Sequence, residues 1–280
     1  MPMVAYLDLL GFRGAVRRHN GSGLALLEGY NAILEVMDRD LRWAKGQEPT
    51  QIQQSRNAGG GLRWAERLRH ITTFLPMSDS LVVVSDDANA LLYMAAHFLA
   101  ESALLNTHRM RLPGYDMRAC PPLLFRGGIA SGDITHLRQL SIEHEESTLR
   151  PNVIGPGLVD AVEIEGFLKA KKRKGPIVWI KGLHHFGLGS ETLVGPCDIE
   201  GYSELLWPNA GVWDLDGSLN PLQLDALRCM AKQGEREWRD CPDIAAHYTG
   251  LHDLILRSVS RVDTDGQAVE WLKRPCEELL

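Results

Sequence analysis

Apolar and polar positions alternate with two different periods along the first 181 residues, and this pattern predicts an ordered series of strands and helices. Apolar runs rich in strand-forming residues predict buried strands at residues 4–10, 122–134 and 176–181. Apolar positions spaced by three and four residues, with capping residues at their ends, predict helices over residues 24–43, 86–107 and 157–171.

Two further segments of this region have a distinct pattern. Between residues 70 and 85, two β-prone runs flank Met77-Ser78-Asp79-Ser80, which predicts a hairpin with Asp79 at its tip. Residues 46–61 are polar and contain three consecutive glycines, so they are predicted to form a loop or insertion. In the strand predicted at residues 122–134, glycines at 127, 128 and 132 would let a neighbouring backbone or ligand approach closely.

The order strand, helix, hairpin, helix, strand, helix, strand predicts an α/β or α+β sandwich, with helices on one face of a mostly antiparallel sheet. The first strand begins almost at residue 1, so no regulatory domain is expected before it. Residues 1–185 are predicted to form the core. Residues 186–280, with helices near 221–239 and 245–259, are predicted to form a C-terminal extension packed on that core, because they lack enough strands for a sheet of their own.

Composition narrows the possible functions. The chain has 280 residues, of which 44% are hydrophobic and 24% charged, as expected of a folded globular protein. Its net charge of −6 excludes a partner such as nucleic acid or an anionic membrane held by charge alone. No segment reaches the roughly 18–20 apolar residues of a membrane span.

The cysteines and the N-terminus favour the cytoplasm. The first residues contain no basic lead, no long apolar core and no small-residue cleavage site, so they do not resemble a secretory signal. Without a C-x-x-C pair, the cysteines are predicted to be reduced thiols rather than a disulfide framework or a zinc site. They are Cys120, Cys197, Cys229, Cys241 and Cys276.

Two aspartates are the main candidates for chemistry. Asp8 interrupts an apolar strand, where an isolated carboxylate needs a cation or several hydrogen-bond donors. If the hairpin pairs with the first strand, Asp8 and Asp79 face one spot at a strand end, and two carboxylates suit Mg²⁺ or Mn²⁺. The alternative is that Asp79 only forms the turn and Asp8 caps a loop.

Other residue groups favour ordinary structural roles. The basic residues 169–174 could gather phosphates but are more typical of a solvated helix end. Tyr30 could stack on a base, although core packing is favoured. No phosphate-binding loop of the G-x-x-x-x-G-K-[ST] type is present. Three further groups of residues lack the spacing of a metal site or of a hydrolase triad. These groups are His184-His185, His144-Glu145-Glu146, and the serines Ser78 and Ser80.

Four segments in order resemble the landmarks of the class III nucleotidyl cyclases. They are LDLLGF at 7–12, MSDS at 77–80, RGGIASG at 126–132 and NVIGPGLVDAVEIEG at 152–166. The closer resemblance is to the Pycsar pyrimidine cyclases of bacterial antiphage defence, which open with a similar D-x-LGF motif. The resemblance covers about residues 4–181 and implies an α+β fold of the ferredoxin or palm type.

The resemblance also implies the site. Asp8, Asp79 and the backbone carbonyl of Leu9 would hold two Mn²⁺ or Mg²⁺ ions. Gly11 and Phe12 would lie where backbone N–H groups meet a triphosphate. Arg126 would lie in the strand beside the site, as a phosphate contact or as part of a structural salt bridge.

Several residues depart from the purine cyclases. Asn152 and Leu75 stand where adenylyl cyclases have the Asp and Lys that select adenine, so the hydrogen-bond pair that reads adenine is absent. Val159 and Glu163 replace the Asn and Arg that support the transition state, so another cation is needed. Val162 stands where the pyrimidine branch commonly has Tyr.

We therefore expect a metal-dependent pyrimidine nucleotide cyclase, with UTP converted to 3′,5′-cyclic UMP and pyrophosphate. Metal ions would lower the pKa of the ribose 3′-OH and neutralise the leaving pyrophosphate. The resemblance further implies a head-to-tail homodimer with its sites at the interface, and a product that activates a separately encoded effector during phage infection. The alternatives are a cytidylate cyclase, a catalytically silent nucleotide-binding sensor, and a nucleotidyltransferase on a related palm fold.

Overall fold

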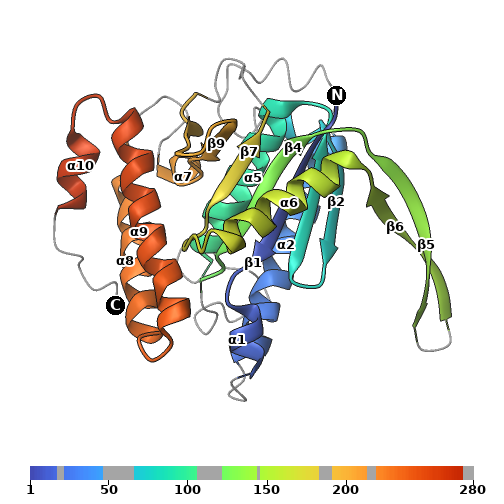
Figure 1. Ribbon diagram of the computed structural model, residues 1–280, viewed down its shortest axis with the longest axis horizontal. Coiled ribbons are helices and arrows are strands. Elements are labelled where there is room, and N and C mark those ends of the chain that lie inside the picture. The colour runs from blue at the N-terminus through green and yellow to red at the C-terminus, as the bar shows by residue number, and fades with distance from the viewer. Residues whose placement is uncertain are drawn as a thin grey trace.

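The computed structural model describes residues 1–17, 22–46, 66–105, 122–143, 146–182, 191–212 and 219–273. Seven strands form one sheet in the order β2-β3-β1-β4-β7-β9-β8 (Figure 1). All neighbouring pairs run antiparallel except β4 and β7. The strands are β1 (Met3–Leu9), β2 (Ile71–Met77), β3 (Ser80–Ser85), β4 (Phe125–Ser131), β7 (Val178–Lys181), β8 (Val194–Pro196) and β9 (Tyr202–Leu205). The predicted α+β class with a mostly antiparallel sheet is confirmed.

Helices cover both faces of this sheet, which corrects the expectation that they lie on one face. The helices are α1 (Phe12–Arg17), α2 (Ser22–Gly46), α5 (Ala88–Ala103), α6 (Pro156–Ala170), α7 (Asn209–Val212), α8 (Pro221–Glu237), α9 (Pro242–Val262) and α10 (Gln267–Leu272). Helices α2 and α5 pack on one side of β1, and α6 packs on the other (Figure 1). The reason is that β1 is apolar on both faces: Ala5 and Leu7 face α5, whereas Val4 faces α6.

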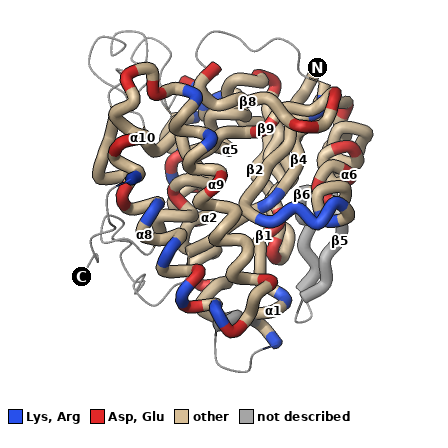
Figure 2. Tube along the Cα trace, turned by 60° about the vertical axis from the view of Figure 1, so that its left-hand side comes forward, with Lys and Arg blue, Asp and Glu red and all other residues tan. Residues whose placement is uncertain are grey.

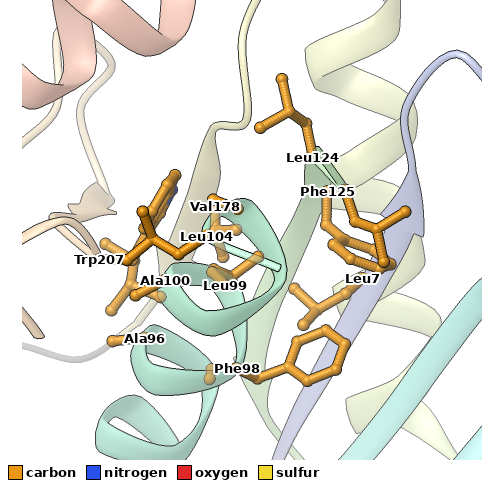
Figure 3. Close-up of a cluster of buried hydrophobic side chains, with 14 of the residues drawn as sticks. Leu7, Ala96, Phe98, Leu99, Ala100, Leu104, Leu124, Phe125, Val178 and Trp207 are labelled. Carbon is orange, nitrogen blue, oxygen red and sulfur yellow. The ribbon is translucent and has the colours of Figure 1, made fainter. Parts of the chain in front are cut away.

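The sheet continues beyond residue 185. Strands β9 and β8 extend it at the β7 edge, so residues 186–280 contribute strands as well as helices. Trp207, which follows β9, is fully buried in the same apolar core as Leu7, Phe98 and Phe125 (Figure 3). Its indole N–H donates a hydrogen bond to the carbonyl of Pro176 at 2.9 Å. The C-terminal region thus shares the core with residues 1–185.

A hairpin of two nine-residue strands, β5 (Thr135–Glu143) and β6 (Glu146–Ile154), was not predicted. It forms a separate two-stranded sheet that projects from the body as an arm (Figure 1). Apolar residues in this segment do not keep a strict two-residue alternation, which explains why the pattern failed to indicate strands. The loop predicted at residues 46–61 lies almost entirely outside the described residues.

Helix α9 braces the loop between α6 and β7. Gly175 in that loop has a φ of +104°, and a Cβ there would lie 3.0 Å from the backbone of Gly250 on α9. The N–H of Gly175 donates to Nδ1 of His247, also on α9, at 3.1 Å. Lys174 pairs with Asp243 at the start of the helix. The tight backbone approach requires glycine at both 175 and 250.

The described cysteines differ in their bonding. The prediction of reduced thiols is wrong for Cys229, which is disulfide-bonded, whereas Cys197 and Cys241 are free. Cys120 and Cys276 lie outside the described residues.

Among the helices that the structure describes, none combines the length and the apolar character of a membrane span.

Candidate functional site

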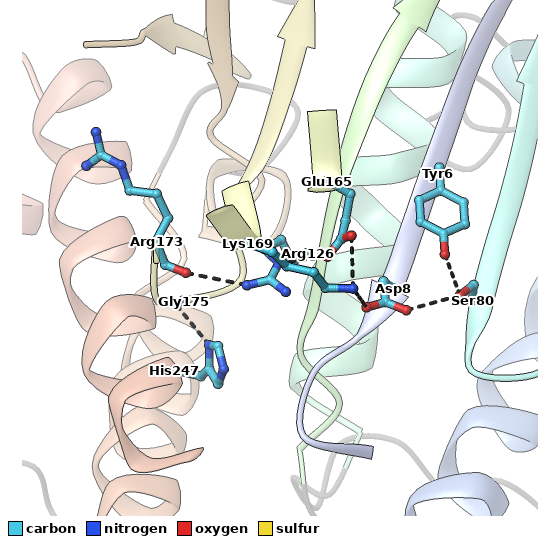
Figure 4. Close-up of polar contacts among 9 residues, drawn as sticks. All are labelled: Tyr6, Asp8, Ser80, Arg126, Glu165, Lys169, Arg173, Gly175 and His247. Atoms are coloured by element: carbon cyan, nitrogen blue, oxygen red, sulfur yellow. Dashed lines mark hydrogen bonds and ion pairs between the residues drawn. The ribbon is translucent and has the colours of Figure 1, made fainter. Parts of the chain in front are cut away.

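The candidate site lies at the end of β1, on the sheet face covered by α6. Side chains alternate along β1, so Tyr6 and Asp8 share the face of Val4. The strand register places Ser80 of β3 and Arg126 of β4 on either side of Asp8. The last two turns of α6 cross above them and bring Glu165 and Lys169 to the same place (Figure 4).

Both carboxylate oxygens of Asp8 have partners (Figure 4). The hydroxyl of Ser80 donates to Oδ1 at 3.1 Å, and the Lys169 ammonium donates to Oδ2 at 3.1 Å. The hydroxyls of Tyr6 and Ser80 are 3.0 Å apart. The side chain of Asp8 is only 16% exposed, so these contacts replace most of the water that an ionised carboxylate would otherwise bind.

Lys169 bridges two carboxylates. Its Nζ is 3.1 Å from Asp8 Oδ2 and 3.0 Å from Glu165 Oε2, one helical turn earlier. Burial lowers the pKa of the Lys169 ammonium, but the hydrogen bonds to Glu165 and Asp8 outweigh that effect and raise it overall. Lys169 thus lies at a helix end with half of its side chain exposed, as expected, but it also contacts two carboxylates, which the sequence did not indicate.

Arg126 and Glu165 form the buried part of this network, with side chains 9% and 5% exposed. The guanidinium Nε donates to Glu165 Oε1 at 3.0 Å, and Nη1 donates to the carbonyl of Arg173 at 3.4 Å. Arg126 thus has the structural salt bridge that was one of its two expected roles. We call Asp8, Arg126, Glu165 and Lys169 the charged network.

Asp79 lies beside Asp8, in the turn between β2 and β3. The N–H of Leu9 donates to the carbonyl of Asp79 at 2.9 Å, which fixes the hairpin turn against the end of β1. The hydroxyl of Tyr30 donates to the carbonyl of Ser80 at 2.7 Å. Burial, followed by the nearby charges of Asp79 and Asp8, raises the pKa of Tyr30. The strand pairing thus places the Asp79 turn next to the end of β1, and the convergence of the two carboxylates stays a prediction.

The donors at this point suit a divalent cation in part. Because the N–H and carbonyl of one residue point to the same side of an antiparallel strand, the Leu9 carbonyl also faces the hairpin turn. Two carboxylates and one carbonyl are hard oxygen ligands. Over the described ranges, no group of three or more His, Cys, Asp or Glu side chains could hold a metal. The donor set therefore fits Mg²⁺ or Mn²⁺ only if substrate phosphates and water complete the coordination.

The segment predicted to meet a triphosphate follows directly. Gly11 has a φ of +79° and Phe12 begins α1. This turn and α1 both pack against α9, since a Cβ at Gly11 would lie 3.8 Å, and one at Gly14 3.2 Å, from the side chain of Ile244. Helix α9 thus supports two loops at the edge of the site.

The residues predicted at base-selecting positions lie elsewhere on the same side of the sheet. Leu75 of β2 packs in the apolar cluster beneath α6, together with Val153. The side-chain oxygen of Asn152 accepts the N–H of Val153 at the base of the arm. Val159, Val162 and Glu163 are exposed on α6 rather than directed into the charged network.

The other candidates from the sequence have clear placements. Tyr30 is 1% exposed and packs in the core against Phe125, as favoured. The basic run after Lys169 forms a blue stretch at the end of α6 in Figure 2, and in it Arg173 pairs with Asp198. His184-His185 and His144-Glu145 lie outside the described residues.

Sequence reasoning missed Tyr6, Ser80, Glu165 and Lys169 as members of one site. Two signals could have found them. The two-residue period of β1 places Tyr6 beside Asp8, and the four-residue spacing of Glu165 and Lys169 places them on one helix face. No known protein family matches the chain, and no curated protein matches it significantly.

Proposed function

We propose that the chain is a metal-dependent pyrimidine nucleotide cyclase that converts UTP to 3′,5′-cyclic UMP and pyrophosphate. The observation that carries this proposal is the hydrogen bond from the Leu9 N–H to the Asp79 carbonyl, which places the turn that bears Asp79 beside the end of β1 that bears Asp8. The strand order β2-β3-β1-β4, with α6 across the site, supports a cyclase-like palm arrangement. The motif order along the sequence supplies the reaction and the choice of pyrimidine.

In the proposed reaction, the ribose 3′-oxygen forms a bond to the α-phosphorus, and the bond from that phosphorus to pyrophosphate breaks. Bound Mg²⁺ or Mn²⁺ would acidify the 3′-OH and neutralise charge on the phosphates. Asp8, Asp79 and the Leu9 carbonyl would hold the metal ions. The turn at Gly11 and Phe12 positions the triphosphate, and Lys169 supplies the cation that the positions of Val159 and Glu163 lack.

We also propose that the protein acts as a head-to-tail homodimer with its sites at the interface. An isolated two-stranded hairpin is marginally stable in water, so the projecting arm favours a covering partner. Exposed apolar side chains continue from the base of the arm onto α6, and a second copy of this chain would cover them. They are Leu137, Ile154, Val159 and Val162. The cyclic product would activate a separate effector in antiphage defence.

The experiment is incubation with each of the four nucleoside triphosphates and Mn²⁺, with products identified by mass spectrometry. Cyclic UMP is the expected product, and cyclic CMP would replace uridylate with cytidylate specificity. Asp8→Asn and Asp79→Asn should each reduce turnover at least about 100-fold, whereas the matched change Asp240→Asn, on an exposed turn, should not. Linear or dinucleotide products would favour a nucleotidyltransferase.

One observation favours a second candidate, the silent nucleotide-binding sensor. Lys169 forms an ion pair with Asp8, the carboxylate proposed to hold metal, as it would in a site that no longer performs catalysis. The sensor predicts that UTP or CTP binds but no cyclic product forms from any triphosphate.

A further inference from the structure

Any cation that binds Asp8 meets a competitor that belongs to the chain. Lys169 Nζ contacts Asp8 Oδ2 at 3.1 Å, while Ser80 holds Oδ1, so neither oxygen of the carboxylate lacks a partner. A serine hydroxyl is neutral and can remain while a metal ion binds. A lysine ammonium is positively charged, and it cannot share Oδ2 with a divalent cation without strong repulsion.

The network around Lys169 allows it to move away from Asp8. Half of its side chain is exposed, and its flexible four-carbon stem gives the ammonium room to move. Glu165 is 5% exposed and stays paired with Arg126 through its other oxygen, so the loss or gain of Lys169 does not leave Glu165 without a counter-charge. By contrast, the Arg126 guanidinium is directed to Glu165 and to the Arg173 carbonyl.

We propose that Lys169 is a built-in counter-ion for Asp8, which a divalent metal ion must displace. This inference rests on the metal site of the proposed function. The ion pair of Lys169 with Asp8 joins the end of β1 to α6. On metal binding, the ammonium leaves Oδ2, keeps its contact with Glu165, and is released toward solvent, where the phosphates of a substrate would lie.

If Lys169 competes with a metal ion for Asp8, its removal should change the affinity of the protein for the metal ion alone. Lys169→Met should bind Mn²⁺ about three- to tenfold more tightly than the wild type in calorimetric titration, since the competing ion pair is gone. Lys172→Met removes the same charge from an exposed position just after α6, and should change the affinity less than about twofold. This control separates direct competition from a general reduction of positive charge.

A second measurement uses the unmodified protein and does not depend on the folding of a variant. Trace labelling with acetic anhydride should modify Lys169 severalfold faster when Mg²⁺ is added, because its ammonium leaves one of two carboxylates. The labelling of Lys172 in the same sample should stay constant. Unchanged labelling of Lys169 at a saturating metal concentration would overturn the proposal.

The outcomes distinguish this inference from the proposed function. Equal Mn²⁺ affinity in the wild type and Lys169→Met, with weaker binding in Asp8→Asn, would reject displacement but keep the metal site. No Mn²⁺ binding in any of these proteins would reject the metal site and with it both proposals. Tighter binding in Lys169→Met but not in Lys172→Met would establish the competition.

Discussion

Arg126 on β4 and Glu165 on α6 form an ion pair that is almost completely buried, at 3.0 Å, directly beneath the exposed ammonium of Lys169. Breaking a buried pair by removing one partner is strongly destabilising, because the other charge remains without water. The pair therefore joins β4 to α6 and holds Glu165, one of the two carboxylates that Lys169 contacts.

Replacing Glu165 alone should be costly. In Glu165→Leu, Arg126 stays buried with the Arg173 carbonyl as its recorded acceptor, and the free energy of unfolding in urea should fall by about 3 kcal/mol. The double variant Arg126→Met/Glu165→Leu removes both charges and should recover most of that loss. A double variant as unstable as the single one would show that the pair does not act as a unit.

Glycine at position 128 sets the distance between β4 and α6. A Cβ there would lie 2.6 Å from Cβ of Ile164, so Gly128→Ala forces the helix outward and should cost about 1–3 kcal/mol of unfolding free energy. Gly166→Ala on the same helix is the matched control, since nothing lies within 4 Å of its added Cβ. That control should stabilise the protein by up to about 1 kcal/mol, because alanine favours helix.

His247 should make the protein sensitive to mild acid. Burial, followed by Lys174 and Arg126, lowers its pKa to about 4, although Asp243 partly opposes this. Below about pH 6.5 the unfolded chain binds a proton that the folded protein does not, so stability decreases as the pH falls toward 4, by up to about 3 kcal/mol.

The matched variant is His247→Gln, whose amide oxygen could still accept the Gly175 N–H. Urea unfolding of both proteins between pH 7.5 and 4.5 gives the measurement. The wild type should lose more stability than His247→Gln over this range, and parallel losses would show that His247 does not titrate on unfolding.

Residues 1–185 should not fold as an isolated unit. The fragment lacks β9, which pairs with β7, and Trp207, which is 0% exposed in the main core. It should show no cooperative thermal transition by circular dichroism, in contrast to the full chain. A cooperative transition would mean that the C-terminal region only decorates a complete core.

The sequence predicted the elements whose pattern is local and strong. The run at 4–10, the hairpin at 70–85 and the helix after Pro156 all appear in the structure within a few residues of their expected limits. Strands β8 and β9 have only three and four residues, too few for a two-residue period to be recognised. The run at 4–10 is apolar on both faces of the strand, and such a strand needs a covering layer on each face of the sheet.

For the site, the sequence predicted the pairing of the hairpin with β1, which places the Asp79 turn beside the end of the strand that carries Asp8. Lys169 could not be placed in the same way. Its role depends on the angle at which α6 crosses the sheet, and that angle depends on the close contact at Gly128. A helix pattern in the sequence gives a face but not a crossing angle.

Helix α9 contacts the turn after β1 through Ile244 and the loop before β7 through His247 and Gly250. The ribosome synthesises the chain from its N-terminus. Both loops therefore leave the exit tunnel well before α9, the helix that supports them. Until α9 has been synthesised, the nascent chain presents unsupported loops around Asp8. The mature geometry of the site is therefore reached only after α9 has left the ribosome.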